Sequence, residues 1–259
     1  QKERKKTMNT ILQGKKISRI FRQGSMRNTV LDQVDISIYE GDFTVIMGSS
    51  GAGKSTLLYA LSGMDPVSGG KVFYKDREIT SLKEKQMANL RAKEFGFVFQ
   101  QTNLVSNLTL FENVAVAGYV GKKGSTEEIR DRAGRLLRQM KIDKAQNRFP
   151  SQVSGGEAQR AAIARAMVGN PGLLFADEPT GALNRSNTTE VLNLLTDLNR
   201  SGQSILMVTH DMRAAARGNR ILYLEDGKVL DELRLPPYSE IREQNRESKV
   251  SGWLSGLRW

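Results

Sequence analysis

Short apolar segments recur along the chain and are separated by longer, more polar stretches. Residues 43–47 (FTVIM), 173–176 (LLFA) and 204–209 (SILMVT) are such segments, and residues 94–100 contain another, FGFVF. Short runs without regular polar positions are typical of strands buried on both faces of a parallel sheet. Residues 30–38 instead alternate apolar and polar positions, which predicts a half-buried strand.

Helical patterns lie between these strands. Residues 54–61, 126–140, 156–168 and 187–198 are predicted to be helices, and within 126–140 the apolar residues recur three and four positions apart, on one face. Strands that alternate with helices predict an α/β fold with a mainly parallel sheet. Residues 101–159 are mostly helical and interrupt this alternation. We therefore expect a helical subdomain inserted into the sheet domain.

A glycine-rich loop joins the strand at residues 43–47 to the following helix. Its sequence, GSSGAGKS, matches the phosphate-binding P-loop pattern G-x-x-x-x-G-K-[ST]. Glycines let backbone N–H groups close around phosphate oxygens, the lysine reaches the β- and γ-phosphates, and the serine hydroxyl binds Mg²⁺. A glycine-rich turn with a chance lysine is the alternative, and the preceding strand and following helix disfavour it. The predicted nucleotide-binding residues are Gly48, Ser49, Ser50, Gly51, Ala52, Gly53, Lys54, Ser55 and Thr56.

Two carboxylates end the apolar strand at residues 173–176, in the arrangement known as Walker B. Asp177 should emerge at the carboxyl edge of the sheet beside the P-loop and hold Mg²⁺ together with Ser55. Glu178, one residue further, is placed to act as the general base that polarises the attacking water. A strand that ends in a solvated acidic turn is the alternative, and the P-loop elsewhere in the chain disfavours it.

Residues 153–160, VSGGEAQR, open a predicted helix between these two motifs. Ser154 is a favourable N-cap, and Gly155 and Gly156 allow a phosphate to approach the backbone closely. The order of motifs resembles that of ABC transporter ATPases, whose signature has the form LSGGQ or SGGE. The resemblance implies that these three residues bind the ATP held by the P-loop of a second copy. A capped helix with a flexible entry is the alternative for this segment taken alone.

The resemblance assigns roles to further residues. Gln100, which ends GFVFQ, resembles the Q-loop glutamine that contacts Mg²⁺ or the attacking water. His210 resembles the switch histidine that contacts the γ-phosphate; a lone histidine is more often structural, but its place after a strand favours this role. Phe21 matches the aromatic residue that stacks on adenine, where the family usually has tyrosine, and a core phenylalanine is the alternative.

Two positions depart from the family pattern. The segment PTGALN at residues 179–184 matches the D-loop, but Asn184 stands where the family normally has aspartate. Asparagine accepts hydrogen bonds without bringing charge, so the departure concerns the tuning of hydrolysis rather than nucleotide binding. Ala158 replaces the usual glutamine, arginine or lysine of the signature, and we expect a minor effect.

Composition narrows the function classes. The chain has 259 residues, 39% of them hydrophobic and 26% charged, which suits a globular domain with a real core. It has no cysteine, which excludes disulfides and thiolate chemistry, and its only histidine, His210, disfavours a histidine metal cluster. The net charge of +11 fits either an anionic partner or a solvated surface with basic tails. No segment is apolar enough for a membrane span or a signal peptide, so we expect membrane association through a partner.

The resemblance covers residues 15–227 and implies a P-loop NTPase fold: a RecA-like parallel sheet, an inserted helical signature subdomain and a small antiparallel β region. We expect a basic N-terminal tail (1–13), an ABC nucleotide-binding domain (14–230, with the helical subdomain at about 101–159) and a C-terminal extension (231–259). In this extension, Trp253, Leu254, Leu257 and Trp259 have helical spacing and could contact a membrane, a permease or their own domain.

The implied cofactors are ATP and Mg²⁺. The implied partners are a second copy of the chain, in an ATP-sandwich dimer, and an integral-membrane permease, at the cytoplasmic face of a bacterial cell membrane; no nucleic acid is expected. The segments FGFVFQQTNLVSNLTLFENV and ADEPTGALN are similar to the MacB/LolD/FtsE-like branch. Within it, Met47, LKEKQMANLRAKEFGFVFQ and ADEPTGAL look closest to Bce-type antimicrobial-peptide resistance ATPases. Lipoprotein extraction, an FtsE-like role in cell division and, less favoured, a soluble ABC ATPase acting on nucleic acid or ribosomes remain alternatives.

Overall fold

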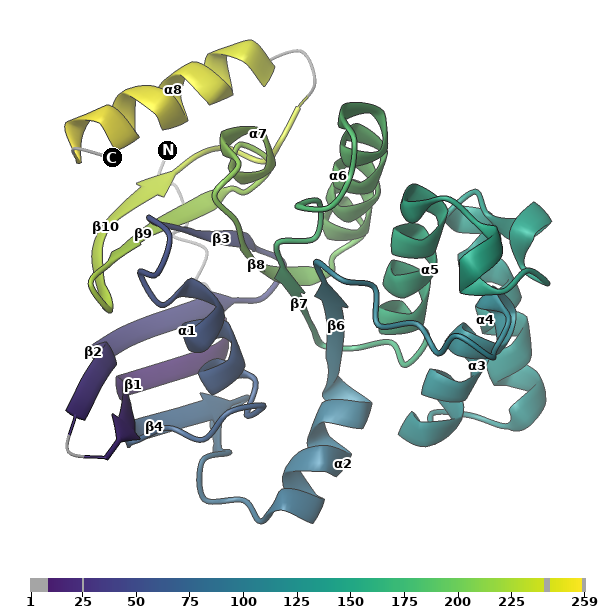
Figure 1. The fold of residues 1–259 in the computed structure, drawn as a ribbon, viewed down its shortest axis with the longest axis horizontal. Coiled ribbons are helices and arrows are strands. Elements are labelled where there is room, and N and C mark those ends of the chain that lie inside the picture. The colour runs from purple at the N-terminus through teal and green to yellow at the C-terminus, as the bar shows by residue number, and fades with distance from the viewer. Residues whose placement is uncertain (1–8, 25, 240–242, 258–259) are drawn as a thin grey trace, which may run out of the picture.

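The central sheet of the computed structural model is built from the short apolar segments, and the structure describes residues 9–24, 26–239 and 243–257. Its strand order is β10-β9-β3-β8-β7-β6, with β10 antiparallel to β9 and the other neighbours parallel (Figure 1). The parallel α/β sheet expected from the apolar runs is confirmed. Its strands are β3 (Phe43–Met47), β6 (Phe95–Phe99), β7 (Leu173–Asp177), β8 (Ser204–Val208), β9 (Arg220–Glu225) and β10 (Lys228–Arg234).

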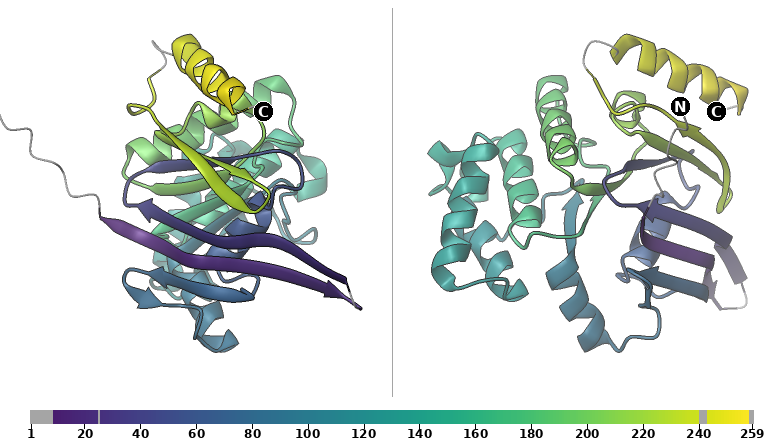
Figure 2. Two further views of the ribbon diagram at one scale, coloured as in Figure 1. Left: turned by 90° about the vertical axis from the view of Figure 1, so that its left-hand side faces the viewer. Right: turned by 180° about the vertical axis from the view of Figure 1, so that it is seen from behind.

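A second sheet is antiparallel and has the order β2-β1-β4-β5. Its strands are β1 (Thr10–Gln23), β2 (Met26–Tyr39), β4 (Gly69–Tyr74) and β5 (Arg77–Glu78). The left view of Figure 2 shows the two long strands β1 and β2 running side by side. The second half of β2 alternates buried and exposed positions, as the sequence pattern of residues 30–38 predicts.

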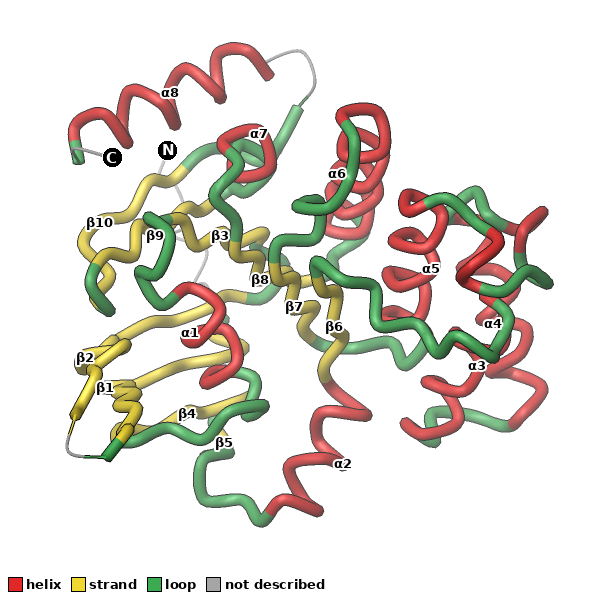
Figure 3. Tube along the Cα trace, in the orientation of Figure 1, coloured by secondary structure: helices red, strands yellow, loops and turns green. Residues whose placement is uncertain are grey.

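Helices cover both faces of the central sheet (Figure 3). The first, α1, lies between the two sheets, where Leu57, Leu58 and Leu61 are fully buried in a core shared with both of them. This packing fixes the loop before α1 against the end of β3. The α-helices are α1 (Lys54–Leu61), α2 (Glu84–Glu94), α3 (Leu110–Gly121), α4 (Thr126–Gln139), α5 (Gly155–Met167), α6 (Arg185–Arg200), α7 (Met212–Ala215) and α8 (Glu243–Gly256).

The helices α3, α4 and α5 form the helical subdomain beside β6 and β7 (Figure 1). They begin at Thr109, Ser125 and Ser154, whose side chains accept a hydrogen bond from the backbone N–H of a glutamate three residues later. Each glutamate carboxylate in turn accepts from the backbone N–H of the cap, a capping box that fixes the start of the helix. The subdomain extends past its expected end at residue 159, because α5 continues to Met167 and buries an alanine-rich face.

Both ends of the cassette reach further than the sequence pattern predicts. β1 begins at Thr10, and Ile11 and Leu12 are buried, so the expected boundary at residue 14 falls inside a strand. β10 continues to Arg234, beyond the expected boundary at residue 230. Only two apolar residues precede a polar stretch at the start of β1, and so short a signal does not distinguish a strand from a tail.

The C-terminal helix α8 packs on its own domain. Arg246 is 3% exposed, and its guanidinium donates hydrogen bonds to three backbone carbonyl oxygens of the segment between α7 and α8. Val250 and Leu254 are buried, and Trp253 Nε1 donates to Asp231 Oδ2 of β10 at 2.8 Å. The sequence analysis allowed this extension to contact a membrane, a permease or its own domain, and the structure shows the contact with its own domain.

Some sequence-based expectations concern residues beyond the described part. The basic residues 2–6 and Trp259 lie outside the described residues. Within residues 9–24, 26–239 and 243–257, no helix combines the length and apolar character needed to cross a membrane.

Candidate nucleotide-binding site

The glycine-rich loop between β3 and α1 depends on close backbone approaches. A Cβ on Gly48 would lie 2.0 Å from the carbonyl oxygen of Leu224. Gly53, the N-cap of α1, has φ of 99°, and its Cβ would lie 2.9 Å from the carbonyl oxygen of Val30. Glycine alone suits these positions. The loop therefore packs against β9 and β2 at the N-terminus of α1, where backbone N–H groups carry partial positive charge.

A cavity of about 510 Å³ lies over this loop. Its volume suits a nucleotide-sized ligand. The cavity joins all the predicted loop residues except Ala52, which is 5% exposed, to side chains that follow β7 and β8. Its lining residues are Val30, Gly48, Ser49, Ser50, Gly51, Gly53, Lys54, Ser55, Thr56, Glu178 and His210.

Lys54 brings a buried positive charge to the cavity. It is 9% exposed, and its Nζ donates to the carbonyl oxygens of Gly48 and Ser49, both at 2.9 Å. Burial lowers the pKa of Lys54 below its usual value, while the nearby charges of Glu178 and Asp177 act in the opposite direction. An anionic phosphate bound at this loop would offset the cost of burying the ammonium group.

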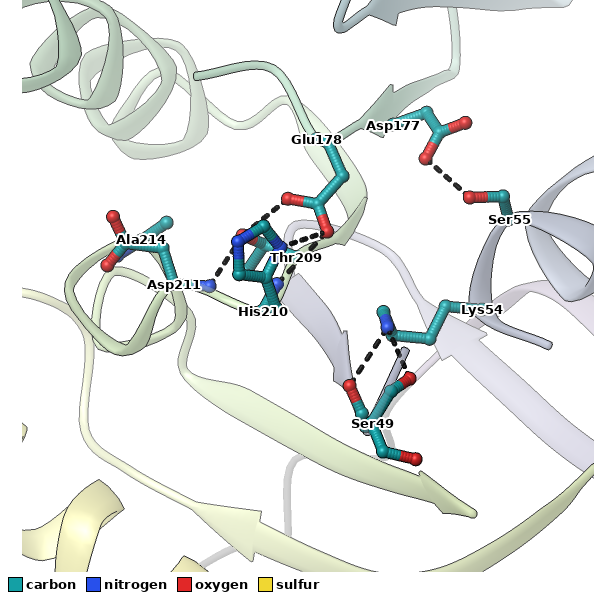
Figure 4. A network of polar contacts seen from close by, with 10 residues as sticks. Ser49, Lys54, Ser55, Asp177, Glu178, Thr209, His210, Asp211 and Ala214 are labelled. Carbon is teal, nitrogen blue, oxygen red and sulfur yellow. Dashed lines mark hydrogen bonds and ion pairs between the residues drawn. The ribbon is translucent and has the colours of Figure 1, made fainter. Parts of the chain in front are cut away.

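Ser55 and Asp177 meet beside the loop, as the sequence predicts (Figure 4). Ser55 Oγ donates to Asp177 Oδ1 at 2.8 Å. Hydroxyl and carboxylate oxygens are the ligands that Mg²⁺ prefers, and Mg²⁺ commonly uses only one or two protein ligands together with water and substrate phosphates. The two residues therefore fit a Mg²⁺ ion bound with a nucleotide.

Glu178 is held by the segment after β8 (Figure 4). Its Oε1 accepts hydrogen bonds from the backbone N–H of His210 at 3.1 Å and from His210 Nδ1 at 2.8 Å, and its Oε2 accepts from Thr209 Oγ1 at 3.1 Å. Its backbone is left-handed, with φ of 46°. A non-glycine residue in this conformation is uncommon and carries strain, which tertiary contacts must hold in place. The carboxylate thus faces the cavity in a fixed orientation.

Gln100 and Phe21 are not among the described residues that line the cavity. The Gln100 side chain packs closely against Gly181 of the D-loop, so that a Cβ on this glycine would lie 2.9 Å from Gln100 Nε2. Phe21 is 43% exposed on β1, with the Arg19 guanidinium 4.6 Å from its ring centroid. Phe21 is therefore not a core residue, and its role in stacking on adenine stays a prediction, as does the role of Gln100.

The signature residues lie at the start of α5, in the helical subdomain, and do not line the cavity of their own chain. Ser154 Oγ donates to the Glu157 carboxylate at 2.8 Å and accepts from its backbone N–H. A Cβ on Gly156 would lie 2.2 Å from Asn187 Oδ1, so α6 packs directly against this glycine. Asn184, the departure in the D-loop, is the N-cap of α6 and accepts from Asn187 N at 3.0 Å.

Several residues at the site were not singled out from the sequence. Thr209 supports Glu178, and the hydroxyl of Tyr59 donates to Asp177. Gln159 is 1% exposed, and its Nε2 donates to the carbonyl oxygens of Phe99 at 2.9 Å and Pro179 at 2.7 Å. It thus ties the signature helix to the segments after β6 and β7. Thr209 directly precedes His210, and Gln159 lies in the signature segment, so their positions beside these motifs could have indicated a role. No motif feature of the sequence indicated a role for Tyr59.

Comparisons with known proteins identify the family. A family model described as ABC transporter matches residues 31–181. The chain is 38% identical over 240 residues to the macrolide export ATP-binding/permease protein MacB of Mannheimia succiniciproducens, covering 93% of this chain and 37% of MacB. It thus spans little more than a third of that relative. It is also 38% identical over 221 residues to an uncharacterized ABC transporter ATP-binding protein of Methanocaldococcus jannaschii, covering 85% of this chain and 98% of the relative.

Comparison with solved structures identifies the same family. The dimeric structure of an ATP-binding cassette in a post-hydrolysis state, bound to ADP and Pi, has a TM-score of 0.81 and 37% sequence identity, covering 88% of this chain and all of that one. A cassette of an ABC transporter complex from Clostridium perfringens has a TM-score of 0.77 and 26% identity, covering 93% of each chain. The chain therefore belongs to the ATP-binding cassette family of ABC transporters and is an ATPase of that family.

Proposed function

We propose that the chain binds ATP with Mg²⁺ in the cavity over the P-loop and hydrolyses it to drive a membrane permease. The observation that carries this proposal is that Lys54 and Ser55 of α1 and Glu178 after β7 line one cavity, and Ser55 donates a hydrogen bond to Asp177 at the end of β7. In this proposal Lys54 and the loop N–H groups bind the phosphates, and Ser55 and Asp177 hold Mg²⁺, which neutralises phosphate charge when bound. Glu178 then accepts a proton from the attacking water, and His210 orients the γ-phosphate.

A complete site needs a second copy of the chain. Ser154, Gly155 and Gly156 do not reach the cavity of their own chain, yet they present a capped helix N-terminus suited to a phosphate. The similar cassette bound to ADP and Pi is described as dimeric. We propose that two copies face each other, with each signature closing the partner's nucleotide site.

One candidate contact for the permease is the apolar segment at residues 101–113, which follows Gln100. Leu110 is fully buried, and Leu104 and Leu108 are half-buried, so these residues mainly support the fold. A second candidate contact is a mainly apolar groove of about 490 Å³ between α2, β6, α3 and α5. Its apolar lining includes Phe97, Phe99, Ala117 and Val120. We propose that a short permease segment docks here.

Val120 offers a direct test of this docking, because its side chain is 64% exposed and can accept a charge without loss of the core. Val120→Glu should abolish co-purification of the permease from detergent-solubilised membranes and leave the ATPase activity of the isolated subunit within about twofold, as for most surface changes. The matched control is Leu230→Glu, a 58% exposed apolar residue on β10. Equal permease recovery with both variants would contradict the docking site.

The identity of the co-purified permease would also test the transported substrate. MacB-type relatives are named for macrolide export. On that basis and on the Bce-like segments, we propose antimicrobial-peptide resistance or export, at the cytoplasmic face of a bacterial membrane. Recovery of a lipoprotein-releasing permease, or of a cell-division membrane protein, would instead support lipoprotein extraction or an FtsE-like role.

A further inference from the structure

The two oxygens of the Asp177 carboxylate have different partners. Oδ1 accepts the hydrogen bond from Ser55 Oγ, and Oδ2 accepts one from the hydroxyl of Tyr59. Ser55 belongs to the proposed Mg²⁺ site, whereas Tyr59 has no part in any of the motifs described above. The side of the carboxylate away from Ser55 is therefore held by a residue that the nucleotide chemistry does not require.

The arrangement follows from the geometry of α1. Ser55 and Tyr59 are four residues apart, so they lie on the same face of the helix, one turn apart. Asp177 ends β7, whose strand lies next to β8 in the sheet under α1. One helix face thus presents two hydroxyl donors to one carboxylate at the carboxyl end of the sheet.

Tyr59 acts in this pair as a donor. A tyrosine hydroxyl carries its proton at neutral pH, and an ionised carboxylate can only accept a hydrogen bond. A bonded Oδ2 fixes rotation of the carboxylate about its Cβ–Cγ bond and so fixes where Oδ1 points.

We propose that Tyr59 is a positioning residue for Mg²⁺: its hydroxyl orients the Asp177 carboxylate toward the ion held beside Ser55. This inference rests on the proposed function, because it concerns the same ion. Groups that hydrogen-bond to metal ligands without touching the metal orient them, and their loss typically costs about 10- to 100-fold in metal affinity or activity. Tyr59 meets this description through a single contact.

The test compares Tyr59→Phe with a matched control, Tyr74→Phe. The hydroxyl of Tyr74 donates to Glu94 Oε2 at 2.9 Å in the antiparallel sheet, so both variants lose one hydrogen bond from a tyrosine to a carboxylate and keep the ring. ATP affinity is measured with a fluorescent ATP analogue in EDTA, and the Mg²⁺ concentration for half-maximal binding enhancement and half-maximal hydrolysis is then titrated. A Mn²⁺ titration followed by electron paramagnetic resonance reports on ion binding directly.

Tyr59→Phe should raise the half-saturating Mg²⁺ concentration by about 10-fold or more, with ATP affinity in EDTA within about twofold of wild type. Tyr74→Phe should leave both unchanged. In an Asp177→Asn background the effect of Tyr59→Phe should vanish, because the carboxylate through which it acts is gone. Equal Mg²⁺ dependence of Tyr59→Phe and wild type, with similar losses of melting temperature in both tyrosine variants, would overturn the inference. Failure of wild type to bind ATP or to respond to Mg²⁺ would instead refute the proposed function.

Discussion

Glu178→Gln separates catalysis from nucleotide binding. The Glu178 carboxylate accepts three hydrogen bonds, from Thr209 Oγ1, His210 N and His210 Nδ1. Glutamine keeps one oxygen, which can face His210, and its amide group can donate to the Thr209 hydroxyl. The side chain therefore stays in place, and what the variant loses is the ability of the carboxylate to take a proton from water.

The magnitudes favour a catalytic effect over a structural one. Hydrogen bonds to a charged group contribute about 1.5–3 kcal/mol, and those between neutral groups about 0.5–1.5 kcal/mol. Because the Glu178 side chain is 17% exposed, we expect the free energy of unfolding to fall by about 1–2 kcal/mol at most. Loss of a general base costs about 10²–10⁴-fold in rate, or about 3–5 kcal/mol of activation free energy.

The assay measures phosphate release over many turnovers at saturating ATP and Mg²⁺, together with ATP affinity and light scattering after size-exclusion chromatography. Turnover should fall by about 10²–10⁴-fold, while ATP affinity stays near wild type and an ATP-bound dimer accumulates. Glu94→Gln is the control, because Glu94 accepts from Tyr74 and Lys75 in the antiparallel region. Multi-turnover hydrolysis by Glu178→Gln within about threefold of wild type would exclude Glu178 as the general base.

Two further predictions concern the dimer and the acid stability of the fold. Ser154→Arg should abolish ATP-dependent dimerisation and spare ATP binding by the monomer. The control, Ser125→Arg, removes the equivalent cap of α4 at the same cost of about 1 kcal/mol and should still dimerise. If light scattering shows that both variants dimerise with ATP, the shared site is contradicted. A hydrogen bond and ion pair with Arg220 at 2.8 Å lower the pKa of Glu232, so its carboxylate stabilises the fold above its unfolded pKa of about 4.3, and this stabilisation is lost as the pH falls through the lower folded value. Urea unfolding should therefore show Glu232→Gln less stable than wild type at neutral pH, with the difference shrinking below about pH 4, and a pH-independent difference would refute this linkage.

Local patterns predicted much of the site because its chemistry is carried by contiguous segments. The segment from β3 through the glycine-rich loop to α1 is one strand-loop-helix unit, and its residues line the cavity together. Asp177 and Glu178 follow directly from a buried strand, so their place at the carboxyl edge of the sheet needed only the strand assignment. The helix limits at Lys54–Leu61 also match the sequence prediction.

Other features could not be predicted because local patterns did not carry them. The start of β1 has only Ile11 and Leu12 as apolar residues, and its strand conformation depends on pairing with β2 and β4. The contact of the Gln100 side chain with Gly181 joins the loops that follow two different strands, β6 and β7. The groove that suits a permease lies between α2, β6, α3 and α5, rather than along one contiguous segment.

The sequence by itself determined which residues are candidates for the chemistry of this protein, because the P-loop, the two carboxylates and the signature are short contiguous motifs. Tertiary structure decided which residues support that chemistry. Tyr59 reaches Asp177 across 118 positions of the chain, and Thr209 reaches Glu178 across 31. These contacts exist because the sheet places β7 beside β8 and packs α1 over both, and strand order is a property of the whole fold rather than of any segment.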